Sequence, residues 1–177
     1  SRSFYFSGVS LKEFMSKKPV LISGLPGKLR IEYPRFSPRG SYFSFVLVEK
    51  TGMELWAIEL KTGRAFRITP PVLSAVLGYP YVWSPDEKSV YCLKRSHLEP
   101  FVDEKILPTG PSIQEAVGTK APARTYQDLL RNKNDEKRFE YFATRSMVCY
   151  TLDGQEHSFL PANIYSDVQL SPDGRYM

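Results

Sequence analysis

Tyr81-Val-Trp83-Ser84-Pro85-Asp86-Glu87-Lys88 is the stretch that decides the fold, because its pattern occurs three times. The other two copies are Tyr33-Pro-Arg-Phe36-Ser37-Pro38-Arg39-Gly40 and Val168-Gln-Leu170-Ser171-Pro172-Asp173-Gly174. Each copy is a short apolar run that turns at Ser-Pro and continues into a further alternating run. In such a turn the serine hydroxyl forms hydrogen bonds with backbone amides further along the chain, and the proline ring fixes its own φ. Glycine at the fourth position can adopt a positive φ. Glu87 stands where the pattern prefers glycine, so we expect the middle turn to be strained or differently shaped.

Residues 33–69 begin with the copy at Tyr33 and have the pattern of four consecutive antiparallel strands. Residues 42–48 are almost wholly apolar or β-favouring, and residues 54–60 form the next run. Thr62-Gly63 then makes a tight turn before a last strand over residues 65–69. Four strands joined by short turns make one blade of a β-propeller.

The spacing of the copies supports a propeller and locates an insertion. Ser37 and Ser84 are 47 residues apart, whereas Ser84 and Ser171 are 87 apart, about 40 more than one blade needs. The excess falls at 96–143, between the second and third strands of a second blade over residues 78–160. It contains two helix-like pieces, 125–130 with Thr125 as N-cap, and 135–142.

The chain as a whole is therefore predicted to be all-β, a partial propeller of four-stranded blades with a loop and helix insertion in one of them. Residues 1–30 would end a preceding blade and residues 165–177 begin a following one, so that residues 1–177 are a fragment of one propeller domain. Because the chain begins and stops inside strand patterns, we expect it to be cut at both ends from a larger protein. A β-sandwich is the alternative for the same turns.

Composition limits the function classes. Of the 177 residues 42% are hydrophobic and 24% charged, as in ordinary globular domains. The net charge of +5 comes from scattered lysines and arginines, which argues against nucleic-acid binding. No run of about 20 apolar residues predicts a membrane span. Cys92 and Cys149 have no CxxC spacing, so we expect no metal site and no cofactor. We interpret them as small apolar strand residues, with a bridge between them left open.

The insertion carries a more specific resemblance. Its residues read Arg124-Thr125-Tyr126-Gln127-Asp128-Leu129-Leu130 and then Asn134-Asp135-Glu136-Lys137-Arg138-Phe139-Glu140-Tyr141-Phe142-Ala143-Thr144, before Leu152-Asp153-Gly154. Together with Ser1-Arg-Ser-Phe-Tyr5 and Pro108-Thr-Gly-Pro111, this string resembles the glutamyl endopeptidase-like branch of the prolyl oligopeptidase family. The resemblance implies a serine peptidase in which an N-terminal propeller gates access to a C-terminal α/β-hydrolase domain. It also favours a bacterial periplasmic or other extracytoplasmic location over the cytoplasm.

The catalytic part of such an enzyme has no counterpart in this sequence. There is no G-x-S-x-G, whose glycines allow the sharp turn around a nucleophilic serine. His97 and His157 have no predicted catalytic partner, so we assign no catalytic residue to the chain. The expected partners are the hydrolase domain and peptide substrates, and open propeller edges would allow self-association.

Two arginines are candidates for binding substrate. A peptidase that cleaves after acidic residues needs a basic group for the substrate carboxylate, and the planar fork of arginine fits it best. Arg124 and Arg145 flank the helix-like pieces; a surface or insertion-stabilising salt bridge is the alternative for each. Trp56 and Trp83 lie in strand patterns and are interpreted as core. We expect the insertion itself to shape substrate access, since long excursions from regular elements are often lids or binding loops.

The main rival to the peptidase is a TolB-like propeller, which binds other proteins and is no enzyme. The helix-bearing insertion is the discriminating feature, because a simple scaffold does not need it. A polysaccharide-binding or other ligand-binding propeller has no supporting motif.

Overall fold

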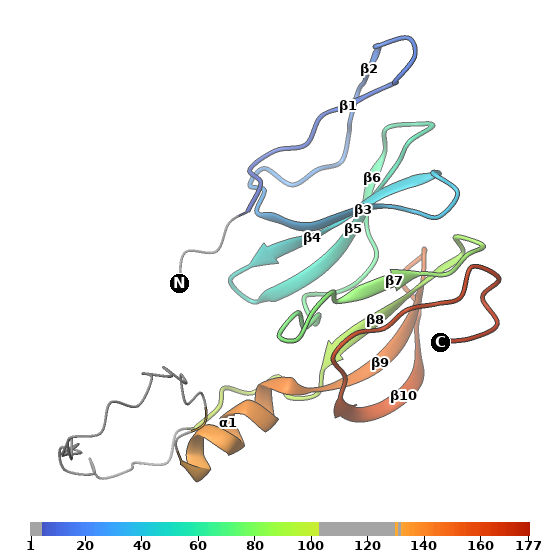
Figure 1. Cartoon of the computed structure of the whole chain (residues 1–177). Coiled ribbons are helices and arrows are strands. Elements are labelled where there is room, and N and C mark those ends of the chain that lie inside the picture. Colours follow the sequence, from blue (N-terminus) through green and yellow to red (C-terminus); the bar gives the residue numbers. More distant parts are fainter. Residues whose placement is uncertain (1–4, 103–129, 131) are drawn as a thin grey trace, which may run out of the picture.

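The computed structural model describes residues 5–102, 130 and 132–177, and Figure 1 shows two four-stranded sheets beside each other with a small hairpin beyond the first. Both sheets are antiparallel, and the strands of each follow one another in space as they do in the chain. The described residues contain one helix. The fold is all-β, in agreement with the partial propeller of four-stranded blades that the sequence predicts.

The first sheet has the order β3-β4-β5-β6. Its strands are β3 (Ile31–Phe36), β4 (Tyr42–Glu49), β5 (Gly52–Glu59) and β6 (Ala65–Arg67). Strands β4 and β5 pair along their whole length, from Tyr42 opposite Glu59 to Glu49 opposite Gly52. The sequence predicts the last strand over 65–69, but β6 ends at Arg67, and beyond it the Leu55 amide donates to the Thr69 hydroxyl at 2.9 Å.

The second sheet has the order β10-β9-β8-β7. Its strands are β7 (Tyr81–Trp83), β8 (Ser89–Arg95), β9 (Thr144–Thr151) and β10 (Glu156–Ile164). Strands β8 and β9 pair from Ser89 opposite Thr151 to Arg95 opposite Arg145. The strands before and after the insertion are therefore direct neighbours, as the repeat spacing predicts.

Helix α1 (Lys133–Ala143) lies in the insertion and leads directly into β9. It begins after Asn132, whose side-chain oxygen accepts from the amides of Asn134 and Asp135 at 2.9 and 3.0 Å. Asp135 and Glu136 add negative charge at the positive end of the helix dipole. The helix predicted over 135–142 is thus confirmed. The helix-like piece at 125–130, with its cap Thr125, falls outside the described residues except for Leu130.

The core lies between the two sheets. Buried residues of β4, β5, β7, β8 and β9 and of the connection between the sheets form one apolar cluster: Val46, Leu55, Ala57, Ile68, Leu73, Tyr81, Trp83, Val90, Cys92, Val148 and Tyr150. The indole nitrogen of Trp83 in this cluster is hydrogen-bonded, since it donates to the Ser44 hydroxyl at 2.8 Å. Trp83 is buried and stacks on Tyr42 with ring centroids 5.4 Å apart, so its interpretation as core is confirmed.

The Ser-Pro turns form as the sequence predicts. In the middle turn the Ser84 hydroxyl donates to Asp86 at 2.6 Å and accepts from the Ser89 amide at 3.1 Å. The third turn repeats this arrangement at Ser171 and Asp173. Glycine at the fourth position has φ of +75° at Gly40 and +70° at Gly174.

Glu87 adopts the same left-handed conformation, with φ of +61°. Its carboxylate is buried and accepts from the Arg39 amide, in the turn of the first sheet, at 2.5 Å. Burial raises the pKa of Glu87, but hydrogen bonds from Ser37, Ser41 and the Arg39 amide outweigh it and hold the pKa below the ordinary value. The middle turn is therefore shaped like the others, and the side chain that replaces glycine joins the two sheets.

The remaining described segments are less regular. Strands β1 (Leu11–Lys12) and β2 (Pro19–Val20) pair as a short hairpin. Residues 165–177 contain the third turn and no assigned strand. Cys92 and Cys149 are both free thiols, which answers the question of a bridge. Helix α1 is too short and too polar to cross a membrane.

Candidate functional site

A cavity of about 340 Å³ lies where the insertion leaves and rejoins the second sheet. Arg95, the last residue of β8, and Thr144, the first of β9, both line it. Ser74, in the connection between the sheets, forms another part of its wall. The remaining lining residues come from the start of the insertion and from α1: Val76, His97, Leu98, Glu99, Pro100, Phe101, Arg138, Tyr141 and Phe142.

One wall of this cavity is aromatic. Tyr141 of α1 stacks on His97 with centroids 4.5 Å apart and lies 5.2 Å from the ring of Phe101. The Tyr141 hydroxyl donates to the backbone carbonyl of Glu99, which ties the helix to the start of the insertion. His97 is therefore a wall residue that packs on an aromatic ring.

Arg95 also lines the cavity and is held by backbone carbonyls. Its Nη2 donates to Pro71 at 2.7 Å and to Thr51 at 3.3 Å, so the guanidinium reaches the β4–β5 turn of the first sheet. Its Nε is buried and has no hydrogen-bond partner among the described residues.

Arg145 lies directly opposite Arg95 in the β8–β9 pair and is fully buried. Its Nη1 donates a long bond of 3.4 Å to the carbonyl of Ser74. Its Nε and Nη2 have no partner in the part of the chain that the structure describes. Burial lowers the pKa of Arg145 from its ordinary value, because the charged form loses water.

The two arginines predicted to bind substrate have different outcomes in the structure. Arg124 lies outside the described residues. Arg145 is positioned at the base of the insertion, buried behind Ser74 and not in the wall of the cavity. The alternative expectation, a salt bridge, has no support at Arg145: the ion pairs found within the described ranges join Arg67 to Glu54 and Lys94 to Glu156.

Sequence reasoning missed the other polar residues of this region. Ser74, Arg95 and Ser96 each carry a buried side-chain atom without a hydrogen-bond partner among the described residues. Ser74 is brought to Arg95 only by strand pairing, since its amide donates to the carbonyl of Leu93. Nothing local in the sequence signals that contact.

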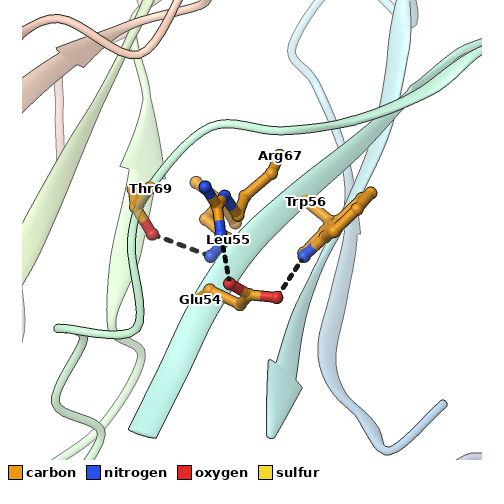
Figure 2. Close-up of polar contacts among 5 residues, drawn as sticks. All are labelled: Glu54, Leu55, Trp56, Arg67 and Thr69. Atoms are coloured by element: carbon orange, nitrogen blue, oxygen red, sulfur yellow. Dashed lines mark hydrogen bonds and ion pairs between the residues drawn. The ribbon is translucent and has the colours of Figure 1, made fainter. Parts of the chain in front are cut away.

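Trp56, the second tryptophan, belongs to a separate polar group in the first sheet (Figure 2). Its indole donates to Glu54 at 2.8 Å, and the other carboxylate oxygen of Glu54 accepts from Arg67 at 3.4 Å. Trp56 is partly buried and packs on the core cluster of the first sheet. This agrees with its interpretation as a packing residue and not as a substrate platform.

A larger hollow of about 900 Å³ lies at the other end of the sheets, among the Ser-Pro turns. Arg35, Arg39, Asp86 and Asp173 contribute to its lining. Both aspartates accept hydrogen bonds from the serine of their own turn, and the guanidinium of Arg35 lies over the ring of Tyr79 at 4.6 Å. The two aspartates and Arg35 therefore already have partners within the protein.

Comparison with known proteins gives two similar plant sequences. The chain is 26% identical to a probable glutamyl endopeptidase, chloroplastic, of Oryza sativa subsp. japonica, and 25% identical to the protein of the same description from Arabidopsis thaliana. Each alignment covers 100% of this chain and 20% of the relative, so the chain spans one fifth of the length of these proteins. No family model matches the chain.

Proposed function

We propose that this chain is the propeller segment of a serine peptidase resembling the glutamyl endopeptidases, and that it gates substrate access to a C-terminal α/β-hydrolase domain. The observation that carries the proposal is the similarity to two probable glutamyl endopeptidases over the whole chain, the helix-bearing insertion included. The bonds that such an enzyme cleaves would be broken by residues outside this chain.

The architecture supports a scaffolding role. Residues 33–69 and 78–160 would be two whole blades, residues 1–30 the end of a preceding blade and 165–177 the start of a following one. The two described sheets share one core, so they form a rigid support for the insertion at 96–143. Helix α1 continues into β9 without a break, and the cavity lies at the adjacent ends of β8 and β9. In the proposal, these strand ends face the hydrolase domain.

The test is peptidase activity in the full-length protein that contains this chain. We expect a fluorophosphonate probe to label one serine outside residues 1–177, and peptides containing glutamate to be cleaved. If the protein is not labelled and cleaves nothing, and the sequence beyond the chain holds only further blades, the TolB-like binding propeller takes the place of the peptidase.

The gating role has its own test. In the full-length enzyme, replacing residues 96–143 by a short turn between Arg95 and Thr144 should change selectivity between short and long peptides. The deletion is feasible because the ends of β8 and β9 are adjacent in the sheet. Unchanged kinetics on both classes of peptide would remove the gating role and leave the peptidase assignment standing.

The open edges of the chain give a further expectation. Strand β10 is exposed along nearly its whole length and presents Phe159 and Ile164 to solvent. We infer that the isolated chain self-associates or is only marginally stable, because an uncovered edge strand pairs readily with another chain. Analytical ultracentrifugation that finds a clean monomer, with a sharp unfolding transition independent of concentration, would contradict this.

A further inference from the structure

The hairpin of β1 and β2 carries the most exposed pair of adjacent apolar side chains in the described part of the chain. Phe14 keeps 90% of its surface exposed and Met15 keeps 86%. Both lie in the turn between the two strands, and Figure 1 shows this hairpin standing beyond the first sheet. Apolar residues that are exposed singly need no explanation, whereas adjacent ones that project together indicate a contact site.

Backbone hydrogen bonds and packing at the base hold this tip in place. The Glu13 amide donates to the carbonyl of Lys18 at 2.9 Å, and the Lys17 amide donates to the carbonyl of Glu13 at 2.8 Å. Leu11 and Ile22, on the two sides of the hairpin, pack on the apolar cluster of the first sheet. The base of the hairpin is therefore attached to the sheet, while the two apolar side chains of the turn stay in solvent.

Basic side chains surround the tip. Lys12, Lys17 and Lys18 are exposed, and none of them belongs to the ion pairs found within the described ranges. The one acidic residue among them is Glu13, whose carboxylate accepts a hydrogen bond from the Ser16 hydroxyl. Three lysines and one glutamate give residues 11–20 a net charge of +2. An apolar tip with lysines around it is complementary to a surface that is anionic outside and apolar inside.

The size of the tip favours a lipid surface over a folded protein. A stable protein interface takes about 800 Å² from each partner, which is far more than two side chains at the end of a hairpin supply. A membrane requires only that a few apolar side chains enter the interface while lysines reach the lipid phosphates. The hydrogen bonds across the turn already pair backbone groups that a bilayer would leave unsatisfied.

We propose that residues 11–20 are a membrane-contact hairpin, which binds the surface of an anionic bilayer. Phe14 and Met15 enter the boundary between headgroups and acyl chains, and the three lysines bind lipid phosphates. The binding is peripheral and reversible, because one hairpin offers few apolar groups, and it requires no helix that spans the membrane. The proposal does not depend on peptidase activity, since neither the cavity beside the insertion nor a catalytic serine takes part in it.

The test is cosedimentation of the full-length protein with lipid vesicles. Vesicles of equal parts phosphatidylcholine and phosphatidylserine should carry the protein into the pellet. Vesicles of phosphatidylcholine alone should bind it about 30-fold more weakly, the size expected for two net charges near an anionic surface. Salt at about 1 M should remove most of this difference, because it screens exposed charges. Binding to neither kind of vesicle, or equal binding to both, would overturn the proposal.

Variants of the tip separate its apolar and basic parts. Phe14→Ser should weaken binding to the anionic vesicles about tenfold or more, because burial of the ring is lost. Phe14→Trp should keep the binding, and its emission should shift to shorter wavelength when vesicles are added, since tryptophan favours the interface. Lys18→Glu should weaken binding about tenfold or more through the change in charge. None of these should lower the Tm, because both side chains are exposed.

Two matched controls test whether the effect belongs to the tip. Leu21 is 87% exposed but follows β2 at the base of the hairpin, and Lys50 is exposed in the β4–β5 turn. Leu21→Ser and Lys50→Glu should each bind within about twofold of wild type, because only groups close to the bilayer contribute. A loss in Leu21→Ser as large as that in Phe14→Ser would mean that exposed apolar surface in general binds lipid, and the proposal would fall.

A protein partner at the tip gives a different result. If ultracentrifugation without lipid finds a dimer of the full-length protein, and Phe14→Ser dissociates it, the tip contacts a second copy and the membrane proposal is wrong. A wild-type protein whose sedimentation without lipid is unchanged by Phe14→Ser, and which loses vesicle binding in that variant, supports the membrane.

Discussion

Glu54 in the first sheet and Arg145 in the second are both buried charged side chains, but they differ in how many of their polar atoms are hydrogen-bonded. Both oxygens of Glu54 have protein donors, the indole of Trp56 and the guanidinium of Arg67 (Figure 2). Arg145 makes one long bond to a carbonyl and keeps two donors unpaired among the described residues. Glu54 therefore meets the condition under which a buried charge is tolerated, and Arg145 does not.

The largest effect is expected at Glu54. Glu54→Ala leaves the Trp56 indole and Arg67 without their acceptor, so the free energy of unfolding should fall by about 2 kcal/mol. Urea denaturation followed by tryptophan fluorescence measures it, and Trp56 reports the local change directly. Glu54→Gln is the control, because its amide oxygen still accepts from Trp56 and most of the stability should remain. Equal losses in the two variants would mean that the charge, and not the Trp56 bond, is what matters.

The opposite sign is expected at Arg145. Arg145→Met fills the same space without a charge, so the free energy of unfolding of the unliganded protein should stay level or rise by about 1 kcal/mol. Thermal denaturation of the two proteins side by side checks this. A loss of stability as large as that of Glu54→Ala would contradict this prediction. It would mean that Arg145 has a partner in the protein that stabilises the fold.

The sequence could predict what local chemistry controls. The Ser-Pro turns and the strands around Ser37, Ser84 and Ser171 follow from residues within a few positions of each other, and the insertion follows from their spacing. That Arg145 is buried opposite Arg95 depends on strand register across the insertion and on Ser74, about 70 residues earlier in the chain. The residue type suggested a role for Arg145, but its surroundings are a property of the tertiary fold.

Glu87 shows the same limit and adds a third buried charge to the comparison. Its departure from glycine was visible in the sequence, whereas its contact with the Arg39 turn was not, because that contact joins different sheets. Its pKa in the folded protein lies below the ordinary value, so its contribution should be complete above about pH 4.5 and be lost as pH falls through the lower, folded value.

Glu87→Gln should therefore lower the free energy of unfolding by about 1 kcal/mol at pH 7. The difference from wild type should shrink toward zero as the pH is lowered below the folded pKa of Glu87. Urea denaturation of both proteins across this range measures it. A difference that does not change with pH would mean that packing of the side chain, and not its charge, joins the sheets.

The smallest effect is expected where a charge pair is open to water. Lys94 and Glu156 form an ion pair at 2.5 Å across the second sheet, but their side chains keep 27% and 35% of their surface exposed. Lys94→Ala should cost about 0.5 kcal/mol, and 1 M salt should remove most of the difference because it screens exposed charges. The same salt should barely change the effect of Glu54→Ala, whose carboxylate is shielded. Pairing alone thus does not make a charge stabilising; the pair must also be shielded from water.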